Sequence, residues 1–174
     1  MRIRNIRHQR GFTLIEVLIS IVILSIGLLG IAGMQATSMQ NNHLAFVKTQ
    51  AAVMAADMAD RIRANSDAAA DYVSTTADAP DDPGCIRSAA GCTPAQLAQY
   101  DLHEWNLQFT RDKPALPAGR AVITRTIDAD GTTMAVTLFW QENNPNDIDR
   151  AQCFPNDNNA QADNEACFQL SFRL

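Results

Sequence analysis

The stretch RGFTLIEVLISIVILSIGLLGIAGM, residues 10–34, decides the fold of this chain. Its apolar part runs for 23 residues from Phe12 to Met34, and Glu16 is the only charged residue within it. As a helix rising 1.5 Å per residue it would be about 34 Å long, enough to cross a bilayer core of about 30 Å. Four arginines and no acid precede it, and such a cluster holds its flank in the cytoplasm. We therefore predict a single membrane-spanning helix, with the rest of the chain on the far side. The arginines are Arg2, Arg4, Arg7 and Arg10.

Glu16 is an energetic anomaly in this segment. A carboxylate near the membrane midplane costs about 2.5–3.5 kcal/mol on insertion scales, and such residues rarely persist without a partner. The apolar run supplies no partner of its own. We therefore expect the partner on another copy or another subunit, which indicates an assembly protein.

The residues around the start of the apolar run resemble the N-terminus of type IV prepilins and pseudopilins. Those proteins share a short basic leader that ends in Gly, followed by Phe-Thr-Leu-Ile-Glu and a long hydrophobic helix. Here Gly11 and all five positions from Phe12 to Glu16 match that signal. The resemblance implies that a prepilin peptidase cleaves after Gly11, removes residues 1–11 as a leader peptide and N-methylates Phe12. It also implies that Glu16 makes an intersubunit contact during assembly.

Two other interpretations account for less of the segment. A plain uncleaved signal anchor accounts for the arginines and the length, but not for Gly11 or Glu16. A secretory signal would have a shorter apolar region of about 7–15 residues, with a small-residue cleavage site after it. Gly27, Gly30 and Gly33 could permit close helix approach or local melting, but Gly is also common in membrane helices. The role of these glycines stays open.

Length and composition limit the number of domains and the kinds of partner that the chain can have. Its 174 residues suit one anchor helix and one modest soluble domain. The leader carries four of the 14 basic and none of the 19 acidic residues, so the mature chain has ten basic residues against 19 acidic ones, a net charge of −9. Such acidity argues against direct binding of nucleic acid, which requires a basic face.

Four cysteines, all beyond the apolar run, are disulfide candidates: Cys85, Cys92, Cys153 and Cys167. They lie on the side of the membrane expected to be oxidising. Four cysteines allow three connectivities, and proximity in the sequence favours Cys85–Cys92 and Cys153–Cys167. Their spacing is not typical of a metal site.

A periodic pattern extends the first helix to about Ala64. Apolar residues recur at steps of three and four, which is typical of a helix with one face on a core. They are Leu44, Val47, Ala51, Met54, Met58 and Ile62. The alternative is two helices broken near Gln40. We predict a leader over residues 1–11, a transmembrane and polymerisation helix over 12–34, its amphipathic second half over 35–66, and a periplasmic globular head over 67–174.

A second helix is predicted after the polar loop of residues 77–91, because Thr93 is a good N-cap and Pro94 a good first helical residue. Its apolar side comprises Leu97, Tyr100, Leu102, Trp105 and Phe109. The string from Asp101 to Trp105 is followed by Leu116-Pro117-Ala118-Gly119. This pair of strings resembles one found in minor pilins of the PilV type, the type IV pilus modification proteins.

Three antiparallel strands are predicted in the last third of the chain. The first alternates over residues 119–127, with Ala121, Ile123 and Ile127 expected on its inner side. Asp128-Ala129-Asp130-Gly131 is a hairpin signal, and residues 133–141 form the second strand. The third spans residues 168–174, with Phe168, Leu170, Phe172 and Leu174 inward. Such a sheet would pack one face on the long helix. By resemblance the fold is therefore α+β and type IV pilin-like, with a disulfide-bounded C-terminal loop over residues 143–165.

The sequence gives no support for an enzyme, a cofactor or a metal. No phosphate-binding loop, His-Glu-x-x-His motif or Gly-x-Ser-x-Gly motif is present. The histidines His8, His43 and His103 lack a neighbouring nucleophile pattern. Four polar residues of the C-terminal loop could in principle bind calcium, but the glycine of an EF-type loop is missing. These are Asp157, Asn159, Asp163 and Glu165.

We therefore expect a minor pilin subunit of a type IV pilus, anchored in the inner membrane with a periplasmic head before it enters the extracellular filament. The resemblance implies as partners the prepilin peptidase, the inner-membrane assembly platform, other minor pilins and the major pilin, with lipid around the helix before assembly. One alternative is a minor pseudopilin of a type II secretion system. An alternative from another class is a membrane-anchored periplasmic binding domain that never polymerises.

Overall fold

A computed structural model describes residues 11–75, 80–110, 114–142 and 165–174. Its elements are α1 (Leu14–Ala64), η1 (Ser66–Tyr72), β1 (Ser74–Thr75), η3 (Cys85–Arg87), α2 (Pro94–Thr110), β2 (Arg120–Asp128), β3 (Gly131–Gln141) and β4 (Glu165–Arg173). The chain divides into two compact units, the first ending at Leu44 and the second beginning at Ala45. Each is described separately.

The first unit contains the N-terminal part of α1. Every residue from Gly11 to His43 is exposed, although most of this segment is apolar. Among the described residues, α1 is the one helix long and apolar enough to cross a membrane, judged by length and composition. The helix continues through Gln40 without interruption, so the alternative of two separate helices is wrong.

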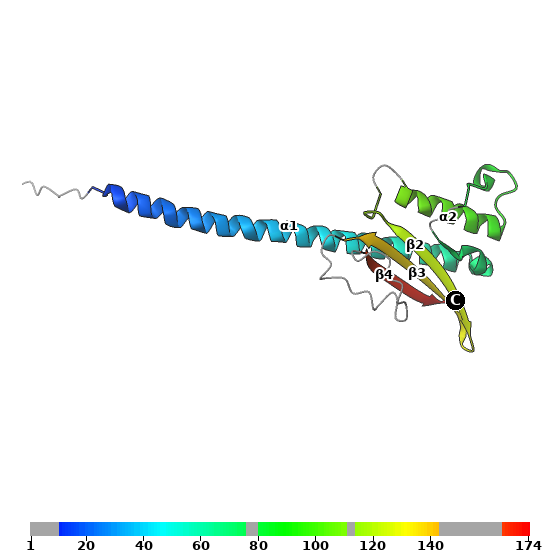
Figure 1. Ribbon diagram of the computed structural model, residues 1–174. Helices are drawn as coiled ribbons and strands as arrows, with labels where there is room; N and C mark the ends of the chain where they lie inside the picture. The colour runs from blue at the N-terminus through cyan, green and yellow to red at the C-terminus, as the bar shows by residue number, and fades with distance from the viewer. Residues whose placement is uncertain (1–10, 76–79, 111–113, 143–164) are drawn as a thin grey trace, which may run out of the picture. The chain divides into compact units, whose positions relative to one another are not determined.

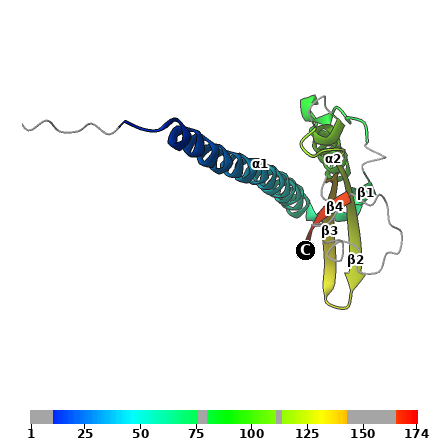
Figure 2. The ribbon, with the colours of Figure 1, turned by 60° about the vertical axis from the view of Figure 1, so that its left-hand side comes forward.

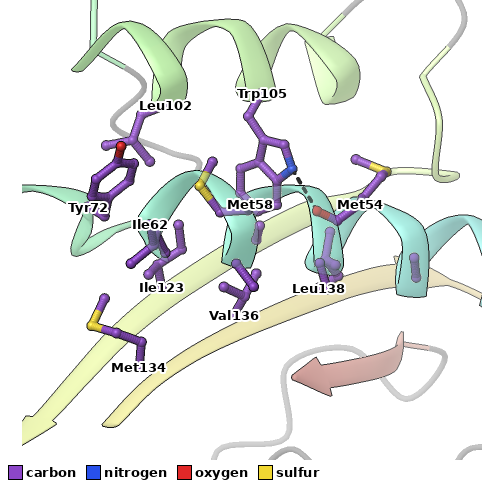
Figure 3. Packing of buried hydrophobic residues seen from close by; sticks show 14 of the residues in the cluster. Met54, Met58, Ile62, Tyr72, Leu102, Trp105, Ile123, Met134, Val136 and Leu138 are labelled. Atoms are coloured by element: carbon purple, nitrogen blue, oxygen red, sulfur yellow. Dashed lines mark hydrogen bonds between the residues drawn. The ribbon is translucent and has the colours of Figure 1, made fainter. Parts of the chain in front are cut away.

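The second unit is built around the C-terminal part of α1, residues 45–64. Figure 1 shows α2 on one side of this segment and strands β2 to β4 on the other. The predicted stripe supplies the contact: Val47, Ala51, Met54, Met58 and Ile62 are all buried, and Leu44 is half-buried. The close-up in Figure 3 shows Met54, Met58 and Ile62 between side chains of α2 and the sheet. Burying an apolar side chain of this size stabilises the fold by about 1.5–3 kcal/mol.

Helix α2 begins with a complete capping box. The Thr93 hydroxyl accepts a hydrogen bond from the amide of Gln96 at 3.3 Å, and the Gln96 side chain accepts one from the amide of Thr93 at 3.0 Å. Two backbone donors that the helix leaves unpaired are thereby satisfied. The predicted start at Thr93-Pro94 is confirmed.

The sheet is antiparallel, in the order β1-β2-β3-β4. The β2–β3 hairpin turns at Ala129 and Asp130, with Asp128 opposite Gly131, as predicted. The prediction of three strands was incomplete, because the two-residue strand β1 adds a fourth at the outer edge of β2. The 3₁₀ helix η1, which leads into β1, was also not foreseen.

Two inward assignments in the sheet are wrong. Ile127 is 67% exposed and Leu174 is 39% exposed, because both lie at the hairpin end of the sheet, beyond the last core residues Met134 and Phe172.

Phe139 is buried on the other face of the sheet. It is 1% exposed, although strand alternation places it on the face opposite Leu138 and Trp140. Its ring lies 3.8 Å from the Arg120 guanidinium, which also binds both carboxylate oxygens of Glu165 at 2.7 and 2.8 Å.

A disulfide joins Cys85 to Cys92, the pairing that proximity favoured. Cys167 is disulfide-bonded as well, but its predicted partner, Cys153, lies outside the described residues. The second pairing therefore stays a prediction. The leader residues Arg2, Arg4, Arg7, Arg10 and His8 lie outside them too, as does the C-terminal loop up to residue 164.

Candidate functional site

The start of α1 is organised by Thr13. Its carbonyl accepts hydrogen bonds from the amides of Glu16 at 3.1 Å and Val17 at 3.3 Å, and its hydroxyl lies 3.4 Å from the Glu16 amide. Thr13 and Glu16 stand in the positions of a capping box, a helix-start signal that is present in the sequence. Among the described contacts only the Thr13 half of the box is present. The Glu16 carboxylate itself makes no hydrogen bond or ion pair there.

Glu16 lies in a shallow groove along one side of the helix. The groove is lined by Phe12, Glu16, Val17, Ser20, Ile21 and Leu24. The Ser20 hydroxyl donates to the Glu16 carbonyl at 2.7 Å, so its hydrogen bond is satisfied within the helix. The carboxylate of Glu16 is thus the charged group of an otherwise apolar groove, and Phe12 lies one turn before it.

The helix itself cannot offset the cost of this charge. An acid in the first turn of a helix gains about 0.3–1 kcal/mol from the helix dipole at an exposed site, and Glu16 is in the first turn of α1. That gain is smaller than the insertion cost of about 2.5–3.5 kcal/mol. In a membrane, the helix dipole alone would therefore not offset such a cost.

Gly27, Gly30 and Gly33 are not required by contacts within the chain. A Cβ atom built at any of the three would meet nothing within 4 Å. Gly30 and Gly33 line a second shallow groove of the same helix, together with Thr37, whose hydroxyl donates to the Gly33 carbonyl at 3.2 Å. The described residues therefore place no packing constraint on these glycines.

In the second unit, Asp101 is the centre of a buried polar cluster. The Arg61 guanidinium donates to one carboxylate oxygen of Asp101 at 3.0 Å, and the Tyr72 hydroxyl donates to the other at 2.6 Å. The Asn65 side chain donates to the Tyr72 hydroxyl at 3.2 Å and to the Pro94 carbonyl at 2.8 Å. Burial raises the pKa of Tyr72, and its hydrogen bond to Asp101 raises that pKa further. The cluster joins the end of α1, the helix η1 and the start of α2.

Trp105 completes the attachment of α2 to α1. Its indole N–H donates to the Met54 carbonyl at 3.1 Å, drawn as the dashed line in Figure 3. The ring packs edge-on against Phe109, with centroids 5.2 Å apart, and Leu102 is buried one turn earlier. The string from Asp101 to Trp105 therefore holds α2 on the long helix.

Comparison with known families decides the identity of the chain. Residues 6–32 match the prokaryotic N-terminal methylation motif, and residues 33–103 match the family described as Type IV pilin Tt1218. The chain is a type IV pilin. The two matches run consecutively through α1 and on into α2, and they end before strands β2 to β4. No curated protein and no solved structure matches the chain.

In this pilin the string from Leu116 to Gly119 forms a tight turn into the sheet. The Gly119 amide donates to the Leu116 carbonyl at 3.1 Å, and the Gln141 amide donates to the Pro117 carbonyl at 2.9 Å. A Cβ atom at Gly119 would lie 2.8 Å from the Leu116 Cβ and 2.9 Å from the Phe109 ring. Glycine is therefore required here for space.

The remaining candidate residues of the pilin show no site chemistry. His43 is exposed, and His103 lies with Nδ1 2.9 Å from the Pro80 carbonyl, a contact between α2 and the preceding loop. Of the calcium candidates, Glu165 binds Arg120, while Asp157, Asn159 and Asp163 are outside the described residues. Among the residues that the structure describes, no three His, Cys, Asp or Glu side chains gather as a metal site would require.

Proposed function

We propose that this protein is a minor pilin of the PilV type, which is held in the inner membrane with a periplasmic head and then enters a type IV pilus. The observation that carries the proposal is the Glu16 carboxylate, which has no partner among the described residues and lies in an exposed, mostly apolar groove next to Phe12. Glu16 would be stabilised by a cation of a neighbouring subunit. The leader indicates which cation that is.

Cleavage after Gly11 frees the amine of Phe12, which stays positively charged after methylation. In a filament of such helices, the Phe12 amine of one subunit meets the Glu16 carboxylate of the next. The attraction of opposite charges at 4 Å rises from about 1 kcal/mol in water to about 4 kcal/mol at an effective dielectric constant near 20. A contact of this size offsets the cost of burying the carboxylate and favours one axial register of insertion.

The PilV assignment rests on the two strings of the head. The first string holds α2 on α1 through Asp101 and Trp105. The second forms the turn into the sheet, with Gly119 close to Phe109 of α2. A minor pilin of this type would help to prime assembly together with other minor pilins. The prepilin peptidase, the inner-membrane assembly platform and the major pilin complete its partners. Its role is structural, with no catalytic step.

The decisive experiment compares Glu16→Ala with Ser20→Ala, a matched change in the same groove. Ser20 bonds only the helix backbone among the described contacts, so its variant should assemble normally. We expect Glu16→Ala to reach the membrane at the normal level and to be missing from sheared pili on an immunoblot. Normal recovery of Glu16→Ala in pili would refute the pairing.

Processing and pathway are tested separately. N-terminal sequencing of the mature protein should begin at an N-methylated Phe12, and Gly11→Val should leave a slower-migrating precursor. A mature protein that begins at Met1 would contradict the prepilin interpretation and favour a membrane-anchored binding domain. Co-purification with secretion components instead of pilus components would favour a minor pseudopilin.

A further inference from the structure

Within the part of the chain that the structure describes, the outer edge of strand β2 has no neighbouring strand along its distal half. Strand β1 covers only Val122 and Ile123 of that edge. The five residues from Thr124 to Asp128 are all exposed. They form the arm of the hairpin that lies at the opposite end of the sheet from α2 in Figure 2.

The backbone of this arm presents unpaired hydrogen-bonding groups. The Leu174 amide donates to the Thr132 carbonyl at 3.0 Å, so the backbone groups of Thr132 face β4 and not β2. In an antiparallel ladder opposite residues alternate between bonded and non-bonded pairs. Ile127, the partner of Thr132, therefore directs its N–H and C=O toward the open edge, and so does Arg125 two residues before it.

The chain's own strand β1 does not extend over these groups. Its register, Ser74 with Ile123 and Thr75 with Val122, leads toward Arg120 as the chain proceeds. Before Ser74 the chain leaves the sheet at Val73, the C-cap residue of η1. None of the described strands of this chain therefore pairs with Arg125 and Ile127 on this side.

The side chains of the arm indicate what kind of strand would fit. Arg125 and Ile127 lie on the same face because alternate residues of a strand share a face. Ile127 is 67% exposed, and Arg125 has no ion-pair partner among the described residues. The two acids at the tip of the hairpin, in contrast to Arg125, have an ion-pair partner. Asp128 and Asp130 lie 3.9 and 3.7 Å from the Arg173 guanidinium. The complementary strand would carry a carboxylate opposite Arg125 and an apolar side chain opposite Ile127.

We propose that the open edge of β2 receives an extended strand from the head of a neighbouring pilin subunit. The incoming strand would continue the β1 ladder along the hairpin, by the addition of a strand to an exposed sheet edge. The proposal rests on the proposed function, because the neighbour is a pilin within an assembled filament. The opposing possibility is that Arg125 protects the edge against pairing, as charged edge residues do in many sheets.

The test uses the full chain in cells that assemble pili. Ile127→Pro removes one N–H that points to the open edge, and an edge strand tolerates proline at such a position. The variant should lower the recovery of the protein in sheared pili about three- to tenfold, which corresponds to the loss of about one hydrogen bond. Arg125→Ala should lower it about two- to fivefold, while Arg125→Lys should retain it. A photo-cross-linking residue at Thr126 should capture a strand peptide of another pilin, and one at Ala95, on α2, should not.

Each failure has a distinct meaning. If the parent chain is absent from pili, the proposed function fails before the edge is tested. If the parent assembles but the Arg125→Ala and Ile127→Pro variants assemble equally well, the edge proposal is overturned. If Ile127→Pro disrupts the fold, seen as loss of near-UV circular dichroism, the Arg125 variants and the cross-link decide. Capture at Thr126 of lipid, or of a protein other than a pilin, also overturns the proposal.

Discussion

The two halves of α1 use the same kind of residue for opposite purposes. In the first half apolar side chains cover every side of the helix and all are exposed, as with Leu18 at 54% and Leu28 at 58%. In the second half one apolar stripe is buried, as with Met54 at 2% and Met58 at 0%, while Phe46 and Val53 on the other side stay exposed. The second half thus completes the core of its own chain. The first half, from Leu14 to His43, contributes no buried side chain to a core.

Trp105 should give the largest effect on the stability of the head. Replacing it by Ala removes a buried ring and its hydrogen bond to Met54, and should lower the free energy of unfolding by about 3–5 kcal/mol. Trp105→Phe keeps much of the ring and should cost less. Denaturant unfolding of the full chain in detergent micelles, followed by near-UV circular dichroism, measures both. Equal losses for the two variants would contradict a packing role.

A paired substitution tests the contrast between the halves of α1 directly. Met58→Ala should destabilise the head by about 2–5 kcal/mol, because it leaves a cavity in the core. Leu28→Ala, a comparable truncation on the same helix, should leave the unfolding of the head unchanged. The same denaturation assay compares them. A loss of head stability in Leu28→Ala would show that the first half of α1 also contributes to the core of the head, and would contradict the contrast between the two halves.

Gly119→Ala should have a moderate effect. The added methyl group would press against Leu116 and the Phe109 ring, and overpacking of this kind costs about 1–3 kcal/mol. Gly131→Ala, in the exposed hairpin turn, serves as the comparison: its φ of 137° strains the backbone, but a Cβ there has open space. Calorimetric melting temperatures distinguish the two. Restored stability when Gly119→Ala is combined with Leu116→Ala would point to the clash as the cause.

The smallest effect concerns alkaline pH. The pKa of Tyr72 is raised in the fold by burial and by its hydrogen bond to Asp101. Its contribution to stability is fully present below the unfolded pKa of about 10 and is lost as pH rises above that value. The free energy of unfolding should fall above about pH 10, by up to about 1.4 kcal/mol per pH unit from this group. Tyr72→Phe should lack this part of the slope while being less stable at neutral pH.

Local patterns predicted most of the elements. The stripe from Val47 to Ile62, the Thr93-Pro94 helix start and the Asp128–Gly131 turn each follow from spacing within a few residues, and the structure confirms them. The errors lie where burial depends on distant residues. Ile127 continues the alternation of Ala121 and Ile123, but it is exposed because the core ends before it.

The sequence by itself determined the membrane-length helix, the single charge of Glu16 within its apolar run and the basic residues that precede it, because these depend on composition and order along one segment. Only the tertiary structure decided what Asp101, Trp105 and Gly119 do. Their partners Arg61, Met54 and Phe109 are brought to them by folding, across 40, 51 and ten positions of the chain. The same holds for the open edge of β2, since whether a strand has a neighbour is a property of the whole sheet.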